Sequence, residues 1–344
     1  MVESLPEEQL EPTEDELVAA IRRVLSGDAP GVVVSVGDDA AVVEPGRHQS
    51  ILTTDMLVED VHFDLARTSP HDLGYKSVVV NVSDVAAMGG SPRYGLVSVG
   101  VPDSVEVAWV MELYGGMREA ANEYAVALVG GDTSLADRVV LSVTLYGEVG
   151  QGRAVTRAGA RPGDRLVVTG ALGAAAGGLR LAQEKPEDVK EILGDEWARS
   201  LVEALERPVA RVGEGQALAA SGATAMMDLS DGLALDLSRL CRESGVGAVI
   251  RAAVVPVHPA LDRLAGAVGA DSLELALHGG EDYELLAALP AEAVGKARDS
   301  IGERFGTAVT EVGEVTEGAV LILDSPEEGQ RTLEPRGWDH FAQE

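Results

Sequence analysis

Five short acidic motifs in the sequence could bind metal ions. They are GDDAAVV (37–43), LTTDMLVEDVHFD (52–64), NVSDVAAMGG (81–90), GGDTS (130–134) and DLSDG (228–232). Each places an aspartate where an apolar segment meets a tight turn, so carboxylates from separate elements can converge. Magnesium prefers oxygen ligands in octahedral geometry, keeps several waters and is usually coordinated by substrate phosphates as well. The set therefore predicts Mg²⁺ sites that bind a phosphorylated ligand.

Each of these aspartates could instead cap a helix or fix a turn, and for any one motif this reading is favoured. Five motifs together shift the balance towards metal binding. The adjacent Asp38 and Asp39 would otherwise each need separate hydrogen-bond donors in an apolar context. A structural calcium ion is a further alternative, but the sequence lacks the D-x-[DN]-x-[DN]-G spacing of an EF-hand loop.

The common nucleotide-binding motifs are missing from the sequence. No G-x-x-x-x-G-K-[ST] loop occurs, and no G-x-G-x-x-G opens a helix after a strand. A protein that uses ATP without them must neutralise phosphate charge with metal ions and backbone amides. The aspartates, with Mg²⁺ between them and the phosphates, would then form the phosphate-binding site.

Charge and cysteine content exclude several classes of protein. The chain has 27 Lys and Arg against 57 Asp and Glu, a net charge of −30, so nucleic acid and anionic membranes are poor partners. The single cysteine, Cys241, rules out a disulfide framework or a cysteine zinc site within the chain. No apolar run approaches the roughly 20 residues that span a bilayer, and the acidic N-terminus lacks a signal peptide's apolar core. We expect a cytoplasmic protein that is neither exported nor membrane-spanning.

At 344 residues the chain exceeds what one hydrophobic core usually holds, so two domains are expected. We predict a disordered acidic tail over 1–12, an N-terminal domain over 13–150 and a C-terminal domain over 151–344. The boundary is placed at the segment rich in Gly, Arg and Pro at 151–164.

Apolar periodicity predicts a mixture of strands and helices in both halves. In the first half, a capping-box pattern at Thr13 predicts the first helix. Strands follow at 31–36, 50–54, 94–100 and 139–149, and an amphipathic helix at 104–123. In the second half, strands are predicted at 164–170, 223–230, 284–290, 308–315 and 319–324, and helices at 173–183, 187–220, after Gly232 and near 291–301.

Eight motifs of the chain resemble those of the thiamine-monophosphate kinase family, within the superfamily of aminoimidazole ribonucleotide synthetase. In chain order they are GDDAAVV, LTTDMLVEDVHF, GYKSVVVNVSDVAAMGG, GGDTS, RAGARPGD, DLSDGLALDL, GGEDYEL and GWDHF, between about residues 30 and 342. The resemblance implies a two-domain α+β aminoimidazole ribonucleotide synthetase-like fold. It also implies a homodimer formed by the N-terminal domains, with ATP bound near that interface.

The resemblance further implies roles for single residues. Those that match magnesium ligands are Asp39, Thr53, Thr54, Asp55, Asp84, Asp132, Asp228 and Asp231, with Asp84 and Asp231 as the catalytic candidates. Those that match contacts to ATP are Tyr114, Gly131, Asp132, Arg157 and Ser230. Those that match contacts to the substrate are His62, Glu281 and Trp338.

The residue types fit these roles, although each also has a structural reading. A lone histidine is more often structural, but His62 lies within an acidic motif and could contact a phosphate. Trp338 could simply anchor the C-terminal segment, but its indole face also suits the cationic thiazolium of thiamine. Arg157 could be an ordinary linker cation, yet in so acidic a chain it is suggestive of phosphate binding.

The implied reaction is direct transfer of the ATP γ-phosphoryl group to thiamine monophosphate, giving thiamine diphosphate and ADP. A phosphate acceptor has a second pKa of about 6, so at neutral pH it is mostly a dianion and needs no general base. Several Mg²⁺ ions would screen the two polyanions and align them.

Other readings remain open at this point. Within the superfamily, aminoimidazole ribonucleotide synthetase is the enzymatic alternative, separable by asking which substrate yields ADP. Selenophosphate synthetase and the hydrogenase-maturation dehydratase need a reactive cysteine near one terminus, whereas Cys241 lies within a predicted helix. The remaining alternative is a non-enzymatic acidic protein that binds Mg²⁺ or Ca²⁺ without discriminating ATP from other polyanions.

Overall fold

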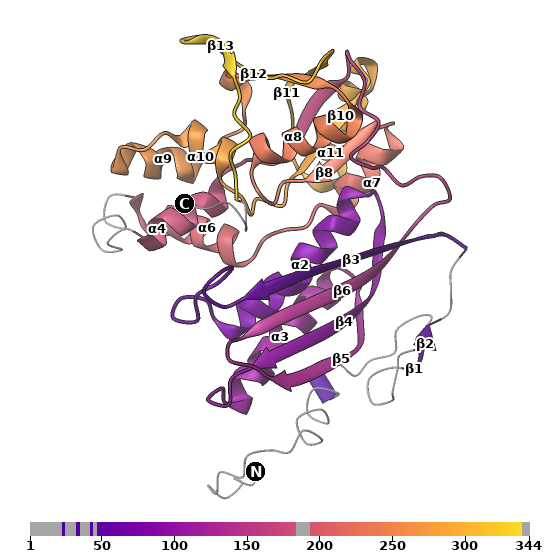
Figure 1. The fold of residues 1–344 in the computed structure, drawn as a ribbon, viewed down its shortest axis with the longest axis vertical. Helices are drawn as coiled ribbons and strands as arrows, with labels where there is room; N and C mark the ends of the chain where they lie inside the picture. Colours follow the sequence, from indigo (N-terminus) through magenta and orange to yellow (C-terminus); the bar gives the residue numbers. More distant parts are fainter. Residues whose placement is uncertain (1–22, 25–31, 35–41, 44–46, 184–192, 339–344) are drawn as a thin grey trace, which may run out of the picture. The chain divides into compact units, whose positions relative to one another are not determined.

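The computed structural model of the chain describes residues 23–24, 32–34, 42–43, 47–183 and 193–338 (Figure 1). The predicted acidic tail, the predicted start of the first helix at Thr13 and the candidate ligand Asp39 lie outside these residues. No helix among the described residues is both long enough and apolar enough to cross a membrane.

The chain forms two compact units, and neither is continuous in sequence. The first takes residues 1–45, 56–77 and 94–143, and the second takes 46–55, 78–93 and 144–344. The predicted domains, by contrast, follow one another along the chain, and their boundaries at 13 and 151 remain a prediction.

The first unit contains a β-strand, a helix and a parallel β-strand in succession. β4 (Ser91–Val101) pairs with β5 (Ala127–Leu135), with Tyr94 opposite Ala127 and Val101 opposite Leu135. Parallel strands need a crossover connection, and α3 (Val107–Glu123) provides it. This helix begins three residues after the predicted start.

Two glycines bring α3 against the first half of α2 (Pro70–Ala87) within this unit. A Cβ added at Gly74 would lie 1.9 Å from the carbonyl oxygen of Leu113, and one at Gly116 would lie 1.8 Å from that of His71. Real Cβ atoms do not approach oxygen so closely, so any larger residue would push the helices apart. The backbones are in contact here because both positions lack a side chain.

The second unit contains a seven-stranded sheet with the order β13-β12-β9-β11-β7-β10-β8. Its pairs are antiparallel except β12 with β9, which are parallel. The strands are β7 (Arg165–Thr169), β8 (Ala225–Asp228), β9 (Gly247–Arg251), β10 (Leu285–Leu289), β11 (Val309–Thr316), β12 (Leu321–Ser325) and β13 (Gly329–Thr332). The helices are α4 (Ala174–Gln183), α6 (Asp195–Glu206), α7 (Val212–Ala220), α8 (Leu233–Ser244), α9 (Pro259–Val268), α10 (Ser272–His278) and α11 (Val294–Phe305), with 3-10 turns η1 (Ala252–Val254) and η2 (Ala291–Ala293).

Two further sheets complete the described structure. β3 (Gln49–Val58) and β6 (Val140–Val149) join β4 and β5 in a four-stranded sheet of order β3-β6-β4-β5. The short strands β1 (Val32–Val34) and β2 (Val42–Val43) pair with each other in antiparallel fashion.

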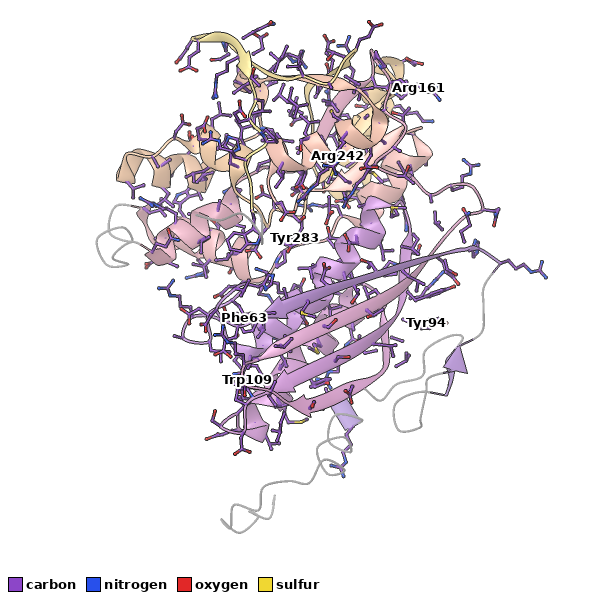
Figure 2. All side chains as sticks on the ribbon, in the orientation of Figure 1. Phe63, Tyr94, Trp109, Arg161, Arg242 and Tyr283 are labelled. Carbon is purple, nitrogen blue, oxygen red and sulfur yellow. The ribbon has the colours of Figure 1, made fainter. Side chains whose placement is uncertain are left out.

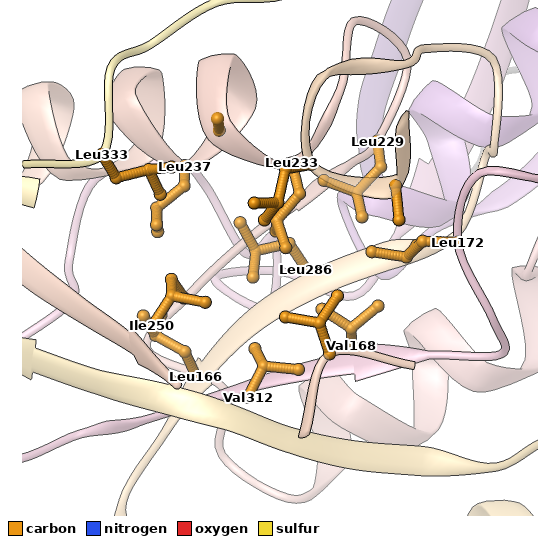
Figure 3. Close-up of a cluster of buried hydrophobic side chains, with 14 of the residues drawn as sticks. Leu166, Val168, Leu172, Leu229, Leu233, Leu237, Ile250, Leu286, Val312 and Leu333 are labelled. Carbon is orange, nitrogen blue, oxygen red and sulfur yellow. The ribbon is translucent and has the colours of Figure 1, made fainter. Parts of the chain in front are cut away.

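The seven-stranded sheet is covered on both faces. In β10 all five residues are buried, and successive side chains of a strand point to opposite faces. Leu286 belongs to the cluster that includes Leu233 and Leu237 of α8 (Figure 3). Leu285 belongs to a second cluster with residues of α7 and α11. Cys241 of α8 is 2% exposed and lies in the first of these clusters.

Most predicted elements are confirmed. The strand patterns at 94–100 and 139–149 correspond to β4 and β6, and the single helical stretch expected at 187–220 contains two helices, α6 and α7. The elements that were not predicted are β2, α2, β5, β9, η1, α9, α10 and β13.

Replacing Gly116 with alanine should destabilise the protein, because the new methyl group would clash with the His71 carbonyl of α2. We expect the free energy of unfolding to fall by about 2 kcal/mol or more, measured by urea denaturation. Gly115→Ala is the matched control, since its nearest neighbour would be the His71 ring carbon at 3.6 Å. That variant should be neutral, or more stable by up to about 1 kcal/mol. Equal effects of the two substitutions would show that the helices are not held in backbone contact.

Candidate active site

Four of the predicted aspartates lie in the second unit and act on one another electrostatically. Asp84 and Asp231 both raise the pKa of Asp55, after burial as the main cause. Asp84 and Asp55 likewise raise the pKa of Asp228, again after burial. The structure therefore brings together carboxylates from three of the five motifs, up to 176 residues apart in sequence.

Asp55 and Asp84 are positioned by contacts between β3 and the second half of α2. The Thr53 hydroxyl donates a hydrogen bond to Asp84 Oδ2. The backbone N–H of Asp55 donates to Asn81 Oδ1 at 3.0 Å, and Asn81 is fully buried. Thr54, the other predicted threonine, is exposed, and its hydroxyl accepts a hydrogen bond from Thr144 at 3.1 Å.

Asp228 is the last residue of β8 and is only 4% exposed. Its Oδ2 accepts a hydrogen bond from the hydroxyl of Ser83, also fully buried, at 2.7 Å. Burial raises the pKa of Asp228 to about 8, with further contributions from Asp84 and Asp236. One short hydrogen bond thus connects α2 to the end of β8.

Nearby positive charge would stabilise the anions of Asp55 and Asp84. Burial raises the pKa of Asp55 to about 7 and raises that of Asp84, although the Thr53 hydrogen bond and the charge of Arg157 act in the opposite direction on Asp84. A buried carboxylate is stable as an anion only beside a cation or several donors. The donor set of carboxylate and hydroxyl oxygens fits Mg²⁺, which prefers oxygen ligands.

The carboxylates do not form a closed metal cage. Among the residues that the structure describes, no three His, Cys, Asp or Glu side chains converge closely enough to hold an ion by themselves. Mg²⁺ bound to nucleotides usually takes only one or two protein carboxylates and completes its shell with water and phosphate oxygens. The arrangement is therefore that of an open site which a phosphorylated ligand would complete.

The loops at 228–232 and 279–285 are joined through their backbones. The N–H of Glu281 donates to the Ser230 carbonyl at 2.7 Å, and the N–H of Tyr283 donates to that of Leu229 at 2.9 Å. Tyr283 is labelled in Figure 2. Glu281 and Tyr283 both have φ in the left-handed region, at 66° and 50°. Such conformations cost free energy in non-glycine residues and cluster at functional sites. Predicted contacts to ATP (Ser230) and to the substrate (Glu281) are thus neighbours.

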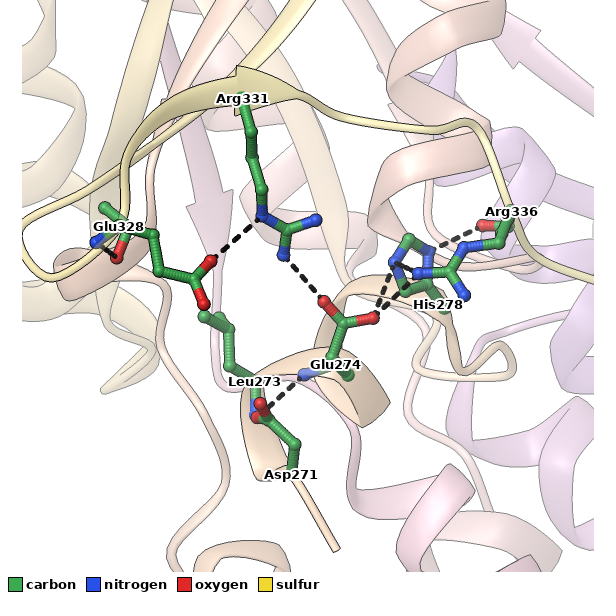
Figure 4. A network of polar contacts seen from close by, with 8 residues as sticks. Asp271, Leu273, Glu274, His278, Glu328, Arg331 and Arg336 are labelled. Atoms are coloured by element: carbon green, nitrogen blue, oxygen red, sulfur yellow. Dashed lines mark hydrogen bonds and ion pairs between the residues drawn. The ribbon is translucent and has the colours of Figure 1, made fainter.

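The segment before Trp338 is fastened to α10 by an ion-pair network around Glu274 (Figure 4). Glu274 accepts hydrogen bonds from Arg331 and Arg336, each at 2.8 Å. Beyond this network, the backbone N–H of Trp338 donates to the Asp231 carbonyl at 3.1 Å, and Trp338 as a whole is 49% exposed. The predicted substrate residue Trp338 is therefore in backbone contact with a predicted metal ligand.

Of the predicted residues that the structure describes, four lie in the first unit. Tyr114 is buried and hydrogen-bonded to Thr133; burial raises its pKa to about 12, and nearby Asp132 adds to the rise. Packing explains why position 131 is a glycine, since a Cβ there would lie 1.8 Å from the Val97 carbonyl oxygen of the neighbouring strand. His62 Nδ1 accepts a hydrogen bond from the N–H of Val58 at 2.9 Å, which stabilises the turn. Tyr114 and Asp132 are thus close together, while the roles of Gly131 and His62 at a ligand remain predictions.

Several residues of the site were not predicted. Asn81 and Ser83 lie within the motif that gave Asp84, and Asp236 lies within the motif that gave Asp231. Arg239 follows two residues beyond the same motif. The i, i+3 spacing of Asp236 and Arg239 on a predicted helix is a signal that could have identified this pair.

Comparisons with known proteins agree with this fold. The family models for AIR synthase related proteins match residues 37–149 (N-terminal domain) and 161–324 (C-terminal domain). The thiamine-monophosphate kinase of Bacillus subtilis (strain 168) is 36% identical over 314 residues, 90% of this chain and 94% of the relative. The crystal structure of thiamine-monophosphate kinase from Stenotrophomonas maltophilia K279a has a TM-score of 0.81 at 35% identity, covering 90% of this chain and 95% of that one. The structure of AaThiL complexed with AMPPCP and TMP has a TM-score of 0.76 at 35% identity, covering 95% and 97%.

The sheets and the two matched domains define the class of AIR synthase related proteins, which confirms the predicted two-domain α+β fold. Identity above one third over nine tenths of the chain specifies the family more closely. The chain belongs to the thiamine-monophosphate kinase family, as its eight motifs predicted.

Replacing Asp228 with asparagine tests whether its charge is unfavourable without metal. Its folded pKa of about 8 lies above the roughly 3.9 of an unfolded aspartate, so folding takes up a proton between these pH values. The free energy of unfolding should therefore fall from about pH 4 to about pH 8 and then level off. In chelator we expect Asp228→Asn to flatten this fall and to raise the free energy of unfolding at neutral pH by on the order of 1 kcal/mol.

The measurement is chemical denaturation across this pH range, with Asp299→Asn as the control because Asp299 is exposed on α11. The control should follow the wild type. A variant less stable than wild type at every pH would mean that Asp228 serves mainly as the acceptor for Ser83.

Proposed function

We propose that this chain is an ATP-dependent kinase that transfers the γ-phosphoryl group of ATP to thiamine monophosphate, giving thiamine diphosphate and ADP. The observation that carries the proposal is the group of four aspartates, Asp55, Asp84, Asp228 and Asp231, which share one compact unit. Within it, Asp84 and Asp231 raise the pKa of Asp55, and Asp84 and Asp55 raise that of Asp228. Relatives named thiamine-monophosphate kinase and the AaThiL complex with AMPPCP and TMP support the substrates.

The residues of this chain would have three tasks in the reaction. The carboxylates of the aspartate group and the Thr53 hydroxyl would hold Mg²⁺, which when bound neutralises phosphate charge. Arg157 influences Asp84 electrostatically, so its guanidinium is available to a phosphate oxygen near that carboxylate. Glu281 and Trp338, joined by their backbones to the 228–232 loop, would orient the acceptor.

The acceptor phosphate is mostly a dianion at neutral pH, because its second pKa is about 6. It can therefore attack without losing a proton to the protein. The step then depends on alignment and on charge screening, which is the task of the aspartate group. An oxygen of the acceptor phosphate bonds to the γ-phosphorus, and the bond from this phosphorus to the β,γ-bridging oxygen breaks, so that ADP leaves.

We extend the proposal to the use of Mg²⁺, to a homodimer formed by the N-terminal domains, to ATP bound by Tyr114, Gly131 and Asp132, and to a cytoplasmic location. Asp39, Thr54 and Asp132 complete the proposed metal ligands, and His62 completes the proposed substrate contacts. Equilibrium sedimentation tests the homodimer directly.

A coupled assay of ADP release tests the reaction. We expect Mg²⁺-dependent turnover with thiamine monophosphate and none with aminoimidazole precursors. Asp84→Asn should lower kcat by about a hundredfold or more while leaving a folded protein, since it removes a metal-binding charge and not a core contact. Asp299→Asn should behave like the wild type. Turnover only with an aminoimidazole precursor would replace the proposal with the synthetase reaction, and wild-type turnover in Asp84→Asn would remove Asp84 from the site.

Trp338→Ala tests the proposed contact to the substrate. An indole face attracts a cation by about 0.5–2 kcal/mol, depending on desolvation. Loss of the ring should therefore raise KM for thiamine monophosphate several-fold and leave KM for ATP nearly unchanged, with Trp338→Phe between the two. If Trp338 only anchors the segment, the melting temperature should drop while both KM values stay at their wild-type levels.

A further inference from the structure

Arg239 and Asp236 form an ion-pair group with Asp231 at the edge of the aspartate site, and neither of these two residues has a role in the reaction described above. Arg239 NH1 contacts Asp231 Oδ2 and also donates a hydrogen bond to Asp236 Oδ1 at 2.7 Å. The other oxygen of Asp236 accepts the backbone N–H of Asp231 at 3.0 Å. Asp236 thus binds both the guanidinium and the turn that carries Asp231.

The side chains of this ion-pair group are largely shielded from solvent. The side chain of Asp236 is fully buried, and those of Arg239 and Asp231 are 27% and 22% exposed. Fully exposed ion pairs contribute little because water and salt screen them. The lower effective dielectric at this site makes the charge of Arg239 felt more strongly by its neighbours.

The Arg239 guanidinium contacts Asp231, which is a proposed metal ligand. Asp231 is close enough to the other carboxylates to raise the pKa of both Asp55 and Tyr283. A guanidinium on Asp231 therefore sits at the edge of the aspartate group. Asp231, Asp236 and Arg239 together carry one net negative charge; without the arginine they would carry two.

We infer that Arg239 is the counter-ion of Asp231 in the metal-free protein and competes with Mg²⁺ for this carboxylate. Arg239 is then a positioning residue that sets the Mg²⁺ concentration at which the site fills. Asp236 keeps the guanidinium beside the site when the carboxylate of Asp231 turns to a metal ion. This inference rests on the proposed function only in taking Asp231 as a metal ligand.

The test is titration of the full-length protein with Mg²⁺ alone, followed by calorimetry without nucleotide. Arg239→Gln removes the charge but retains an amide donor for Asp236, which favours a folded variant. It should bind Mg²⁺ about three- to tenfold more tightly than the wild type, because one opposing unit charge is lost. Arg239→Lys keeps the charge and should remain near the wild type.

Arg242→Gln is the matched control, since Arg242 lies on the same helix with its side chain 70% exposed and paired with Glu243 (Figure 2). Its Mg²⁺ affinity should equal that of the wild type. A second control places Arg239→Gln in an Asp231→Asn background, where the tightening should disappear because its target carboxylate is gone. A purely structural role for Arg239 would not produce this dependence.

An unchanged or weaker Mg²⁺ affinity in Arg239→Gln, or no measurable binding in any variant, would overturn the inference. Tightening that persists in the Asp231→Asn background would also overturn it. The proposed function is judged separately by ADP release with thiamine monophosphate. A wild type that lacks this turnover, combined with the expected Mg²⁺ affinities, would sink the proposed function and leave the role of Arg239 intact.

Discussion

The burial of the Asp228 carboxylate is the constraint on which the site depends. Asp228 ends β8 and is 4% exposed, and its one short hydrogen bond comes from Ser83, 145 residues earlier in the chain. Desolvation disfavours its anion, and Asp84 and Asp55 increase that cost. Such an arrangement is stable only if the carboxylate is protonated or meets a cation. The contact between α2 and β8 thus buries a carboxylate that a bound cation would stabilise. In the proposed reaction, the same cation would screen the phosphates.

Around this carboxylate, the chain is held mainly by backbone contacts. Carbonyl oxygens of the 228–232 loop accept N–H groups from Glu281, Tyr283 and Trp338. Gly280 permits the approach, because a Cβ there would lie 2.3 Å from the Ser230 carbonyl oxygen. The loop positions are therefore set by main-chain geometry, and the side chains they carry can serve chemistry. The ion pairs around Glu274 support the last of these segments from a distance.

The sequence predicted the elements whose patterns are local. β4 and β6 alternate clearly, and α8 follows a recognisable Asp-Gly turn. β13 was missed because its residues, GQRT, are polar and its pairing with β12 depends on the tertiary fold. At the site, the motifs predicted that Asp84, Asp228 and Asp231 would converge.

Other parts of the site depend on distant contacts. Ser83 could not be assigned from one sequence, because a serine within a helix is a common surface pattern. The spacing of Asp236 and Arg239 indicates an ion pair on a helix, but not that this pair adjoins the aspartates of the site. Their roles arise only when α2 meets β8 and when α8 starts beside the aspartates. Gly131 was predicted only as a contact to ATP. The structure adds a packing reason for glycine at this position, because a Cβ there would clash with the backbone of the neighbouring strand.

The reactivity of the Cys241 thiol can report the local opening of α8. Cys241 is the only thiol in the chain, it lies on α8 two residues after Arg239, and burial raises its pKa to about 12. A thiol reagent can therefore react only when this helix opens away from the sheet, so the labelling rate measures the free energy of that opening. A cysteine introduced on the surface would react far faster than Cys241, which makes the natural sequence a ready background for attaching a single fluorophore.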